Sequence, residues 1–391
     1  MARPPQLPAL TSIRFFAAFW VVVFHVSGPY RAQFPGWLAN IVNTSYVGVG
    51  FFFVLSGFIL TYTYGSEASE TSRRKFWIAR FARIYPIYAV ALVLSFVFAV
   101  EGFREAETFL RKGVFGLTFG LAPALLQSWI PSCAGRWNAP GWSLSVEAFF
   151  YALFPFVLIR LMKCRTSLLM PYMVGFWALA CSTAGLYLIL KPDGIAHPDI
   201  YSSSIALTFV KFHPLVRLPE FLLGMTLCRY YQTTKDRCSF GFSLAVVAAA
   251  LIAVVLIFSD KIPMPLLHDG LVDPLLCLLI YGLATARYSA RKILELPLLV
   301  LLGEASYTIY ILQWPIVEWL RRLGVALGVS SASFPLWTAM SIVVVVATSV
   351  ASFKFFETPM RRYIVSRFQA PVPAPTPALY GLEATADEPG T

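Results

Sequence analysis

The sequence predicts an all-α integral membrane protein, and two observations support this prediction. Of the 391 residues, 58% are hydrophobic and only 13% are charged, whereas soluble domains contain about 25% charged residues. Apolar runs long enough to cross a bilayer, which takes about 20 residues per helix, recur along the whole chain. These runs are continuous and do not alternate with a period of two, so a closed β-barrel is excluded.

The apolar runs predict ten spans, at 9–28, 44–63, 80–100, 142–160, 168–190, 205–229, 240–258, 270–287, 297–320 and 334–356. Residues 113–130, GVFGLTFGLAPALLQSWI, are also apolar but contain three glycines and an internal proline. If this stretch does not cross and the N-terminus is cytoplasmic, the most basic loops all face the cytoplasm. We therefore expect about ten transmembrane helices, both termini in the cytoplasm, and a re-entrant or interfacial segment at 113–130. Such a segment is a candidate wall of an active site, because irregular backbone must be covered by protein or by a water-filled cavity.

The net charge, the cysteines and the C-terminal composition further restrict the expected partners and domain organisation. The net charge of +11 comes from basic residues between the apolar runs, where they set topology, so nucleic acid is not an expected partner. The six cysteines have no metal-ligand spacing, and neither a disulfide framework nor a metal site is expected. Residues 1–368 are expected to form one transmembrane domain, and the Pro-rich stretch 369–391 a disordered cytoplasmic tail.

The first span, TSIRFFAAFWVVVFHVSG, contains two ionisable residues, Arg14 and His25. An ionisable group at the bilayer centre costs roughly 2.5–3.5 kcal/mol on insertion scales, which makes both residues candidates for function. Their spacing places them on nearly the same helix face, about three turns and roughly 16 Å apart. Structural alternatives stay open, since an arginine can extend to lipid phosphate and a buried histidine can hydrogen-bond between helices.

Two further arginines, Arg80 and Arg83, share one face at the start of the third span in RFARIYP. A pair of guanidinium groups suits a multiply charged phosphate ligand. The preceding Arg73, Arg74 and Lys75 are expected only to set topology.

Carboxylates also occur in or beside the apolar runs. Glu147 lies in WSLSVEAFFYALFP, and a buried carboxylate must pair, take up a proton or bind a ligand. It could pair with an arginine or orient a catalytic imidazole. Arg217 and Glu220 occur together in the sixth span, and Glu357 and Arg361 are expected to form a structural pair at the cytoplasmic interface.

Six motifs in order resemble those of the acyltransferase-3 family: LTSIRFFAAFWVVVFHV, YVGVGFFFVLSGFIL, RFARIYP, WSLSVEAFFYALFP, RLPEFLLGM and LGEASYTIYILQWP. They extend from about residue 8 to residue 362, nearly the whole expected transmembrane part. Members are integral-membrane enzymes that O-acylate carbohydrates and other hydroxylated acceptors. The resemblance implies acyl-CoA, most simply acetyl-CoA, as the donor substrate, with no bound cofactor. It also implies a multi-pass protein of the bacterial cytoplasmic (inner) membrane.

The resemblance implies a role for each matching residue. The family's arginine–histidine signature falls on Arg14 and His25, its arginine pair on Arg80 and Arg83, and its glutamate on Glu147. His25 would be the catalytic base and Glu147 would stabilise the imidazolium, while the three arginines would hold the phosphates of CoA. Direct transfer to the acceptor and an acyl-histidine relay are equally compatible with the sequence.

Four more residues are weaker candidates for contacts to substrate or oxyanion. Trp142 could stack on a ligand, and Ser143, Ser145 and the amide of Gln313 could donate hydrogen bonds to an oxyanion. Many family members carry histidine where YILQWP has Gln313, so this position cannot be an acid–base group here.

The acceptor is not specified by the sequence. A surface polysaccharide, a lipopolysaccharide sugar or a lipid-linked glycan is expected, and a secreted small molecule such as a macrolide is an alternative. A transporter with a buried polar path is the rival class of function. The expected partners are therefore acyl-CoA, a hydroxylated acceptor and the lipid bilayer, and the oligomeric state stays open.

Overall fold

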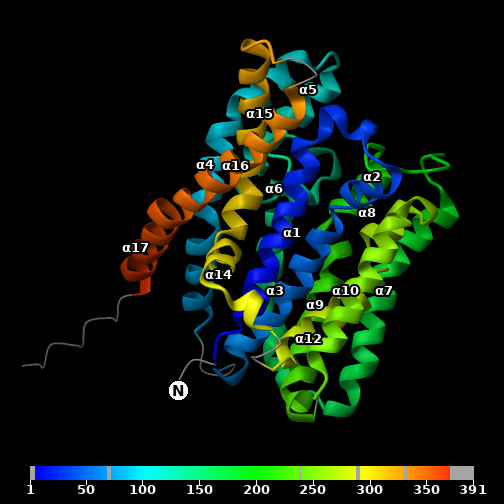
Figure 1. Cartoon of the computed structure of the whole chain (residues 1–391), viewed down its shortest axis with the longest axis vertical. Helices are drawn as coiled ribbons and strands as arrows, with labels where there is room; N and C mark the ends of the chain where they lie inside the picture. Colours follow the sequence, from blue (N-terminus) through cyan, green and yellow to red (C-terminus); the bar gives the residue numbers. More distant parts are fainter. Residues whose placement is uncertain (1–4, 68–71, 238, 288–290, 330–332, 370–391) are drawn as a thin grey trace, which may run out of the picture.

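The computed structural model describes residues 5–67, 72–237, 239–287, 291–329 and 333–369. Within these ranges every regular element is a helix, which confirms the predicted all-α class. The helices form one elongated bundle, with the long helices running side by side along its length (Figure 1). The expected tail, 369–391, lies outside the described residues from residue 370 onward.

In the described ranges, ten helices form the body of the bundle: α1 (Pro8–Val26), α3 (Val47–Tyr64), α4 (Arg73–Glu105), α6 (Gly141–Met162), α7 (Leu169–Leu190), α9 (Pro214–Thr234), α10 (Gly241–Ile257), α12 (Asp273–Thr285), α15 (Ser306–Ala326) and α16 (Phe334–Ser352). Shorter helices connect or extend them: α2 (Gly36–Asn43), α5 (Phe109–Leu121), α8 (Ile205–Phe212), α11 (Met264–His268), α14 (Pro297–Glu304) and α17 (Thr358–Gln369). Seven segments of the described chain are long and apolar enough to cross a membrane, and these lie at α1, α3, α4, α6, α7, α11–α12 and α16–α17.

Two of the expected spans are interrupted. The span at 205–229 is divided between α8 and α9 at His213, whose backbone is extended (φ −73°, ψ 132°). Pro214 follows, and a proline disfavours helical backbone in the residue before it. The His213 ring then accepts a hydrogen bond from the Leu215 N–H (3.3 Å) and caps α9. The span at 297–320 is likewise divided at Ala305 between α14 and α15.

The ambiguous stretch at 113–130 does not form one continuous helix. Helix α5 ends at Leu121, Pro123 follows, and Leu125 has a positive φ of 58° before a short 3₁₀ turn begins at Gln127. A helix of the length of α5, 13 residues, spans about 20 Å, short of the hydrocarbon core of a bilayer.

Helices α3 and α9 are in backbone contact through two glycines. A Cβ atom added at Gly57 would lie 2.1 Å from the Phe221 carbonyl oxygen, and one at Gly224 would lie 1.9 Å from the Val54 carbonyl oxygen. Small residues of this kind let membrane helices approach closely and gain dispersion contacts. The two helices lie side by side, and α3 also packs against α1 in the middle of the bundle (Figure 1).

We expect Gly224→Ala to destabilise the protein, because the added methyl group meets backbone that cannot rotate away. Overpacking of this kind costs about 1–3 kcal/mol. Thermal unfolding of purified protein in detergent should show a lower midpoint. The matched control is Gly175→Ala in α7, where an added Cβ meets no atom within 4 Å. Equal midpoints for the two variants would contradict the importance of the α3–α9 contact.

Candidate active site

A cavity of about 150 Å³ lies between α1, α3, α4, α6 and α15. We call it the arginine cavity. Its polar lining consists of Arg14, Ser56, Arg80, Arg83, Ser143, Glu147, Tyr151, Tyr307 and Tyr310. The structure therefore brings together five predicted site residues from distant parts of the sequence: Arg14 on α1, Arg80 and Arg83 on α4, and Ser143 and Glu147 on α6.

A second cavity, of about 810 Å³, adjoins the first, and we call it the vestibule. Arg14, Arg80 and Arg83 line both cavities and mark the junction between them. The vestibule begins beside residues 5–8 and also carries Lys354, Arg361 and Arg362. A cavity lined mainly by positive charges concentrates anions, so the vestibule is suited to a polyanionic ligand.

The three arginines at the junction differ in their partners. Arg83 forms an ion pair with Glu357 and donates a hydrogen bond to the Glu304 carbonyl oxygen (3.3 Å). Arg14 and Arg80 form no ion pair with any described residue. The Arg80 guanidinium instead lies 6.0 Å from the centre of the Tyr151 ring. Two cations thus stand at the junction without a counterion among the described residues.

Glu147 lies on α6 and faces the same cavity. Its carboxylate accepts hydrogen bonds from the hydroxyl groups of Tyr151 and Ser56, the latter over 3.3 Å. The Glu147 carboxylate attracts the Arg14 guanidinium electrostatically. Within the described residues, however, Glu147 forms no ion pair with an arginine. Ser143, one turn earlier, shares a hydrogen bond with the Tyr310 hydroxyl (3.0 Å). Hydroxyl groups therefore hold the carboxylate in the cavity wall.

His25 lies on α1 together with Arg14, as predicted, near the opposite end of the helix. Its half-buried ring packs edge-on against Phe24, with ring centres 5.1 Å apart. It is not among the residues that line the arginine cavity or the vestibule. The structure therefore does not place the predicted catalytic imidazole beside Glu147 in one cavity.

The weaker candidates, apart from Ser143, lie behind the cavity wall. Trp142 packs on Phe212, with ring centres 4.6 Å apart. Ser145 donates to the Leu125 carbonyl oxygen (2.7 Å) and thereby ties α6 to the 113–130 stretch. Gln313 is fully buried, and its amide donates within its own helix to the Tyr310 carbonyl oxygen (3.1 Å).

The expectation that residues 113–130 form a wall of the site is wrong for the arginine cavity. None of them lines it. They support α6 from behind, where Ser128 donates to the Trp142 carbonyl oxygen (2.7 Å) and Gln127 to that of Gly141 (2.7 Å).

The ion-pair partner of Glu357 was not predicted correctly from the sequence. We expected Glu357 to pair with Arg361 at the cytoplasmic interface. Instead Glu357 is fully buried, pairs with Arg83 and accepts a hydrogen bond from Thr308. No sequence signal connects it to Arg83, which is 274 positions away. Tyr151 could have been found, because it follows Glu147 by four residues and so shares its helix face.

Comparison with known proteins gives two kinds of match. A profile of the acyltransferase domain family matches residues 7–354. The chain is 30% identical to acyltransferase MdmB of Streptomyces mycarofaciens over 96% of its own length and 97% of that protein. It is 24% identical to O-acetyltransferase OatA of Staphylococcus aureus over 93% of its length, but it spans only 58% of that protein. No solved structure matches the chain.

We expect Glu357→Gln to destabilise the protein by about 3 kcal/mol, because it leaves the Arg83 guanidinium without its buried partner. The measurement is the free energy of unfolding in detergent. Glu101→Gln is the matched control, since Glu101 pairs with Arg322 near the surface, where water screens the ion pair and its contribution to stability is small. A loss for Glu357→Gln no larger than that of the control would refute this account of Arg83.

Proposed function

The chain belongs to the acyltransferase-3 family and is an O-acyltransferase, and on this premise we propose that it moves an acyl group, most simply acetyl, from acyl-CoA to a carbohydrate hydroxyl group. The observation that carries the proposal is a pair of arginines, Arg14 and Arg80, that have no counterion in the described part of the chain. They lie at the junction between a basic vestibule and a smaller cavity. The name of the relative OatA supports acetyl as the group transferred.

The charge of the vestibule supports acyl-CoA as the donor. CoA carries phosphate groups on a nucleotide, joined to a long flexible arm that ends in the thioester. Guanidinium groups bind phosphate through paired, charge-assisted hydrogen bonds. We assign the phosphates to Arg14, Arg80 and Arg83 and to the exposed Arg361 and Arg362, and the arm to the arginine cavity beyond them.

His25 is the proposed catalytic base. It would take the proton of the acceptor hydroxyl, whose oxygen then attacks the thioester carbon. The C–S bond breaks and the departing CoA thiolate takes up a proton. Glu147 would stabilise the positive charge of the protonated His25 imidazole through space, from its place in the arginine cavity.

An acyl-histidine relay is the second candidate mechanism. It requires an imidazole nitrogen of His25 to reach the thioester carbon and then the acceptor hydroxyl. In this scheme the nitrogen attacks the thioester carbon, CoA leaves as the thiol, and the acceptor hydroxyl later displaces the imidazole. In both schemes His25 is essential.

The proposed setting is a bacterial cytoplasmic membrane, with ten crossings and both termini in the cytoplasm. The basic vestibule then faces the cytoplasm, where acyl-CoA is made. We propose a surface or lipid-linked glycan as acceptor, because a membrane-embedded enzyme is unnecessary for a soluble cytoplasmic one. Neither a metal nor nucleic acid enters the proposal, and family membership favours the enzyme over the transporter considered from the sequence.

We expect His25→Ala to abolish acyl transfer. Purified protein in nanodiscs is incubated with radiolabelled acetyl-CoA, and release of free CoA is measured. A positioned base contributes about 10²–10⁴-fold, so the variant should lose at least 100-fold in rate while its melting temperature and acetyl-CoA binding stay near those of the wild type. Full activity in His25→Ala would refute the catalytic assignment.

We expect Arg80→Ala to raise the KM for acetyl-CoA about tenfold or more, since a hydrogen bond to a charged group contributes about 1.5–3 kcal/mol. Arg74→Ala is the matched control, because Arg74 lies on the same helix and lines neither cavity. The same steady-state assay measures both variants. Donor binding would be wrongly assigned if KM changed equally in the two, or if only the acceptor KM changed.

A further inference from the structure

A third cavity is lined by α2, by the residues that lead into α3, by residues 196–201 between α7 and α8, and by the segment around α11. We call it the distal cavity. It measures about 460 Å³, and small-molecule sites typically measure about 300–1,000 Å³. Among the described residues it shares none of its lining with the arginine cavity or the vestibule. It is therefore a separate candidate binding site.

The charged groups of the distal cavity already have partners. Lys261 forms an ion pair with Asp260 (2.7 Å), which also accepts a hydrogen bond from the Asn40 amide (2.9 Å). Asp199 accepts hydrogen bonds from two backbone N–H groups of its own turn (3.0 and 2.6 Å). Two carboxylates and one ammonium group thus belong to the described lining, whereas the vestibule is lined mainly by cations. This charge balance favours a neutral ligand over an anionic one.

Neutral hydrogen-bonding groups of the same cavity remain free for a ligand. The Asn43 amide oxygen accepts a hydrogen bond from Arg31 (3.0 Å), but the Asn43 amide nitrogen donates to no other described residue. The Tyr46 hydroxyl and the His197 ring likewise form no hydrogen bond within the described ranges. An amide nitrogen donates, and a phenol and a neutral imidazole can each donate and accept. Sugar hydroxyl groups do both, so they match this set.

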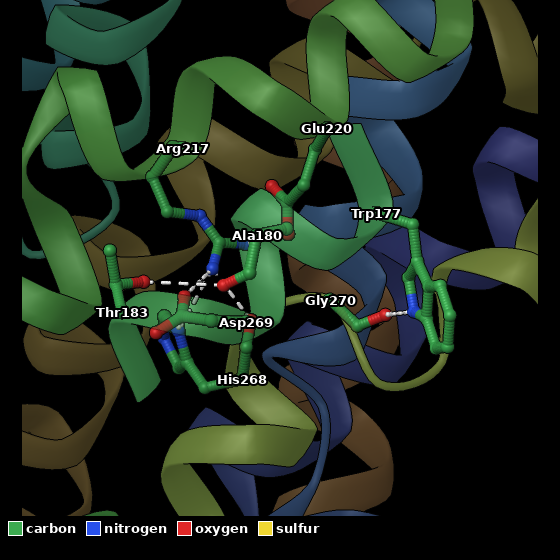
Figure 2. A network of polar contacts seen from close by, with 8 residues as sticks. All are labelled: Trp177, Ala180, Thr183, Arg217, Glu220, His268, Asp269 and Gly270. Atoms are coloured by element: carbon green, nitrogen blue, oxygen red, sulfur yellow. Dashed lines mark hydrogen bonds and ion pairs between the residues drawn. The ribbon is translucent and has the colours of Figure 1, made fainter. Parts of the chain in front are cut away.

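The Tyr46 ring packs against a buried charged cluster. This charged cluster consists of one guanidinium group, one imidazole and three carboxyl groups, those of Arg217, His268, Glu220, Asp269 and Asp273. The Tyr46 ring stacks on His268 with centres 5.1 Å apart. Figure 2 shows Arg217 pointing from α9 toward His268, and an Arg217 nitrogen lies 3.1 Å from a His268 ring nitrogen. Because the cluster holds His268 in place, the Tyr46 ring is preorganised for a ligand.

Arg31 joins the distal cavity to the part of α1 that carries His25. Its buried guanidinium donates hydrogen bonds to the Asn43 amide oxygen (3.0 Å) and to the Tyr201 hydroxyl (2.7 Å), and both residues line the distal cavity. The same guanidinium donates to the carbonyl oxygen of Phe24, the residue before His25, and lies 4.0 Å from the centre of the Phe24 ring. One side chain thus contacts both the cavity lining and the neighbour of the proposed catalytic base.

From these contacts we propose that the distal cavity binds a neutral sugar ring through Tyr46, Asn43 and His197. This inference rests on the proposed function and deepens it. The bound ring is a non-reacting unit of the acceptor glycan, and the next unit of the glycan presents its hydroxyl group at His25. Arg31 is a positioning residue, because it fixes the cavity lining relative to α1.

The reacting groups meet at His25 and not inside the distal cavity. His25 lies eleven residues, about 16 Å along α1, from Arg14. The flexible arm of the donor extends to His25 from the arginine cavity, and the glycan extends to it from the distal cavity. Each cavity therefore holds a part of its substrate that does not react.

A glycan array tests the sugar site without acyl transfer. Full-length protein in fluorescently labelled nanodiscs, without acetyl-CoA, is applied to an array of neutral and acidic bacterial oligosaccharides. We expect the wild type to bind neutral oligosaccharides, and Tyr46→Phe and His197→Ala to bind them about three- to tenfold more weakly, as for loss of one hydrogen bond. Tyr172→Phe is the matched control, because it also removes one phenol hydroxyl but lines none of the three cavities.

Three results would overturn the sugar site. They are binding no stronger than that of empty nanodiscs, binding of acidic oligosaccharides alone, and undiminished binding by both cavity variants. Equal melting temperatures of the variants and the wild type would show that a loss of binding does not come from unfolding.

Acyl transfer to the neutral oligosaccharide that binds best tests the role of Arg31. We expect Arg31→Gln to raise the KM for this acceptor about tenfold, and Tyr201→Phe, which removes one partner of Arg31, to raise it about threefold. The KM for acetyl-CoA should change less than twofold in both variants. An unchanged acceptor KM in both, or a change confined to acetyl-CoA, would refute the positioning role.

The two assays separate this inference from the proposed function. A wild type that binds neutral glycans but releases no CoA from acetyl-CoA would retain the sugar site and contradict the proposed function. A wild type that transfers acetyl groups but binds no neutral glycan would contradict the sugar site alone.

Discussion

The backbone contact between α3 and α9 fixes the geometry on which both polar regions depend. Gly57 and Gly224 let the two helices touch without intervening side chains. Helix α3 contributes Ser56 and Phe53 to the arginine cavity, and α9 contributes Arg217 to the charged cluster. Because packed membrane helices gain little from the hydrophobic effect, close dispersion contacts must hold them together. A shift of either helix would therefore disturb the cavity and the cluster at once.

Two buried regions of the molecule have opposite imbalances of charge. At the arginine cavity, Arg83 pairs with Glu357, whereas Arg14 and Arg80 have no ion-pair partner within the residues that the structure describes. In the cluster around Arg217, carboxyl groups outnumber the guanidinium three to one. A charge buried without a partner is unfavourable, and the cations at the arginine cavity therefore support the proposal that an anion binds there.

Much of the site was predictable because its residues repeat at helical spacing. Arg80 and Arg83 share a helix face by their separation of three, and the structure places both in one cavity with Arg14 and Glu147. The position of His25 outside that cavity was not predictable from α1 alone. A common helix face does not place two residues three turns apart in one cavity, since the neighbouring helices decide where space remains.

The sequence by itself determined the all-α class, the family and the positions of the main helices, because hydropathy and short motifs are local properties of the chain. It also indicated which ionisable residues would lie in apolar surroundings. Only the tertiary structure decided the partners of those residues, such as Glu357 for Arg83 and Asp269 for Arg217. Ion pairs form between side chains whose helices pack together, and that packing depends on the close fit of glycines and side chains along whole helices, which no local pattern encodes.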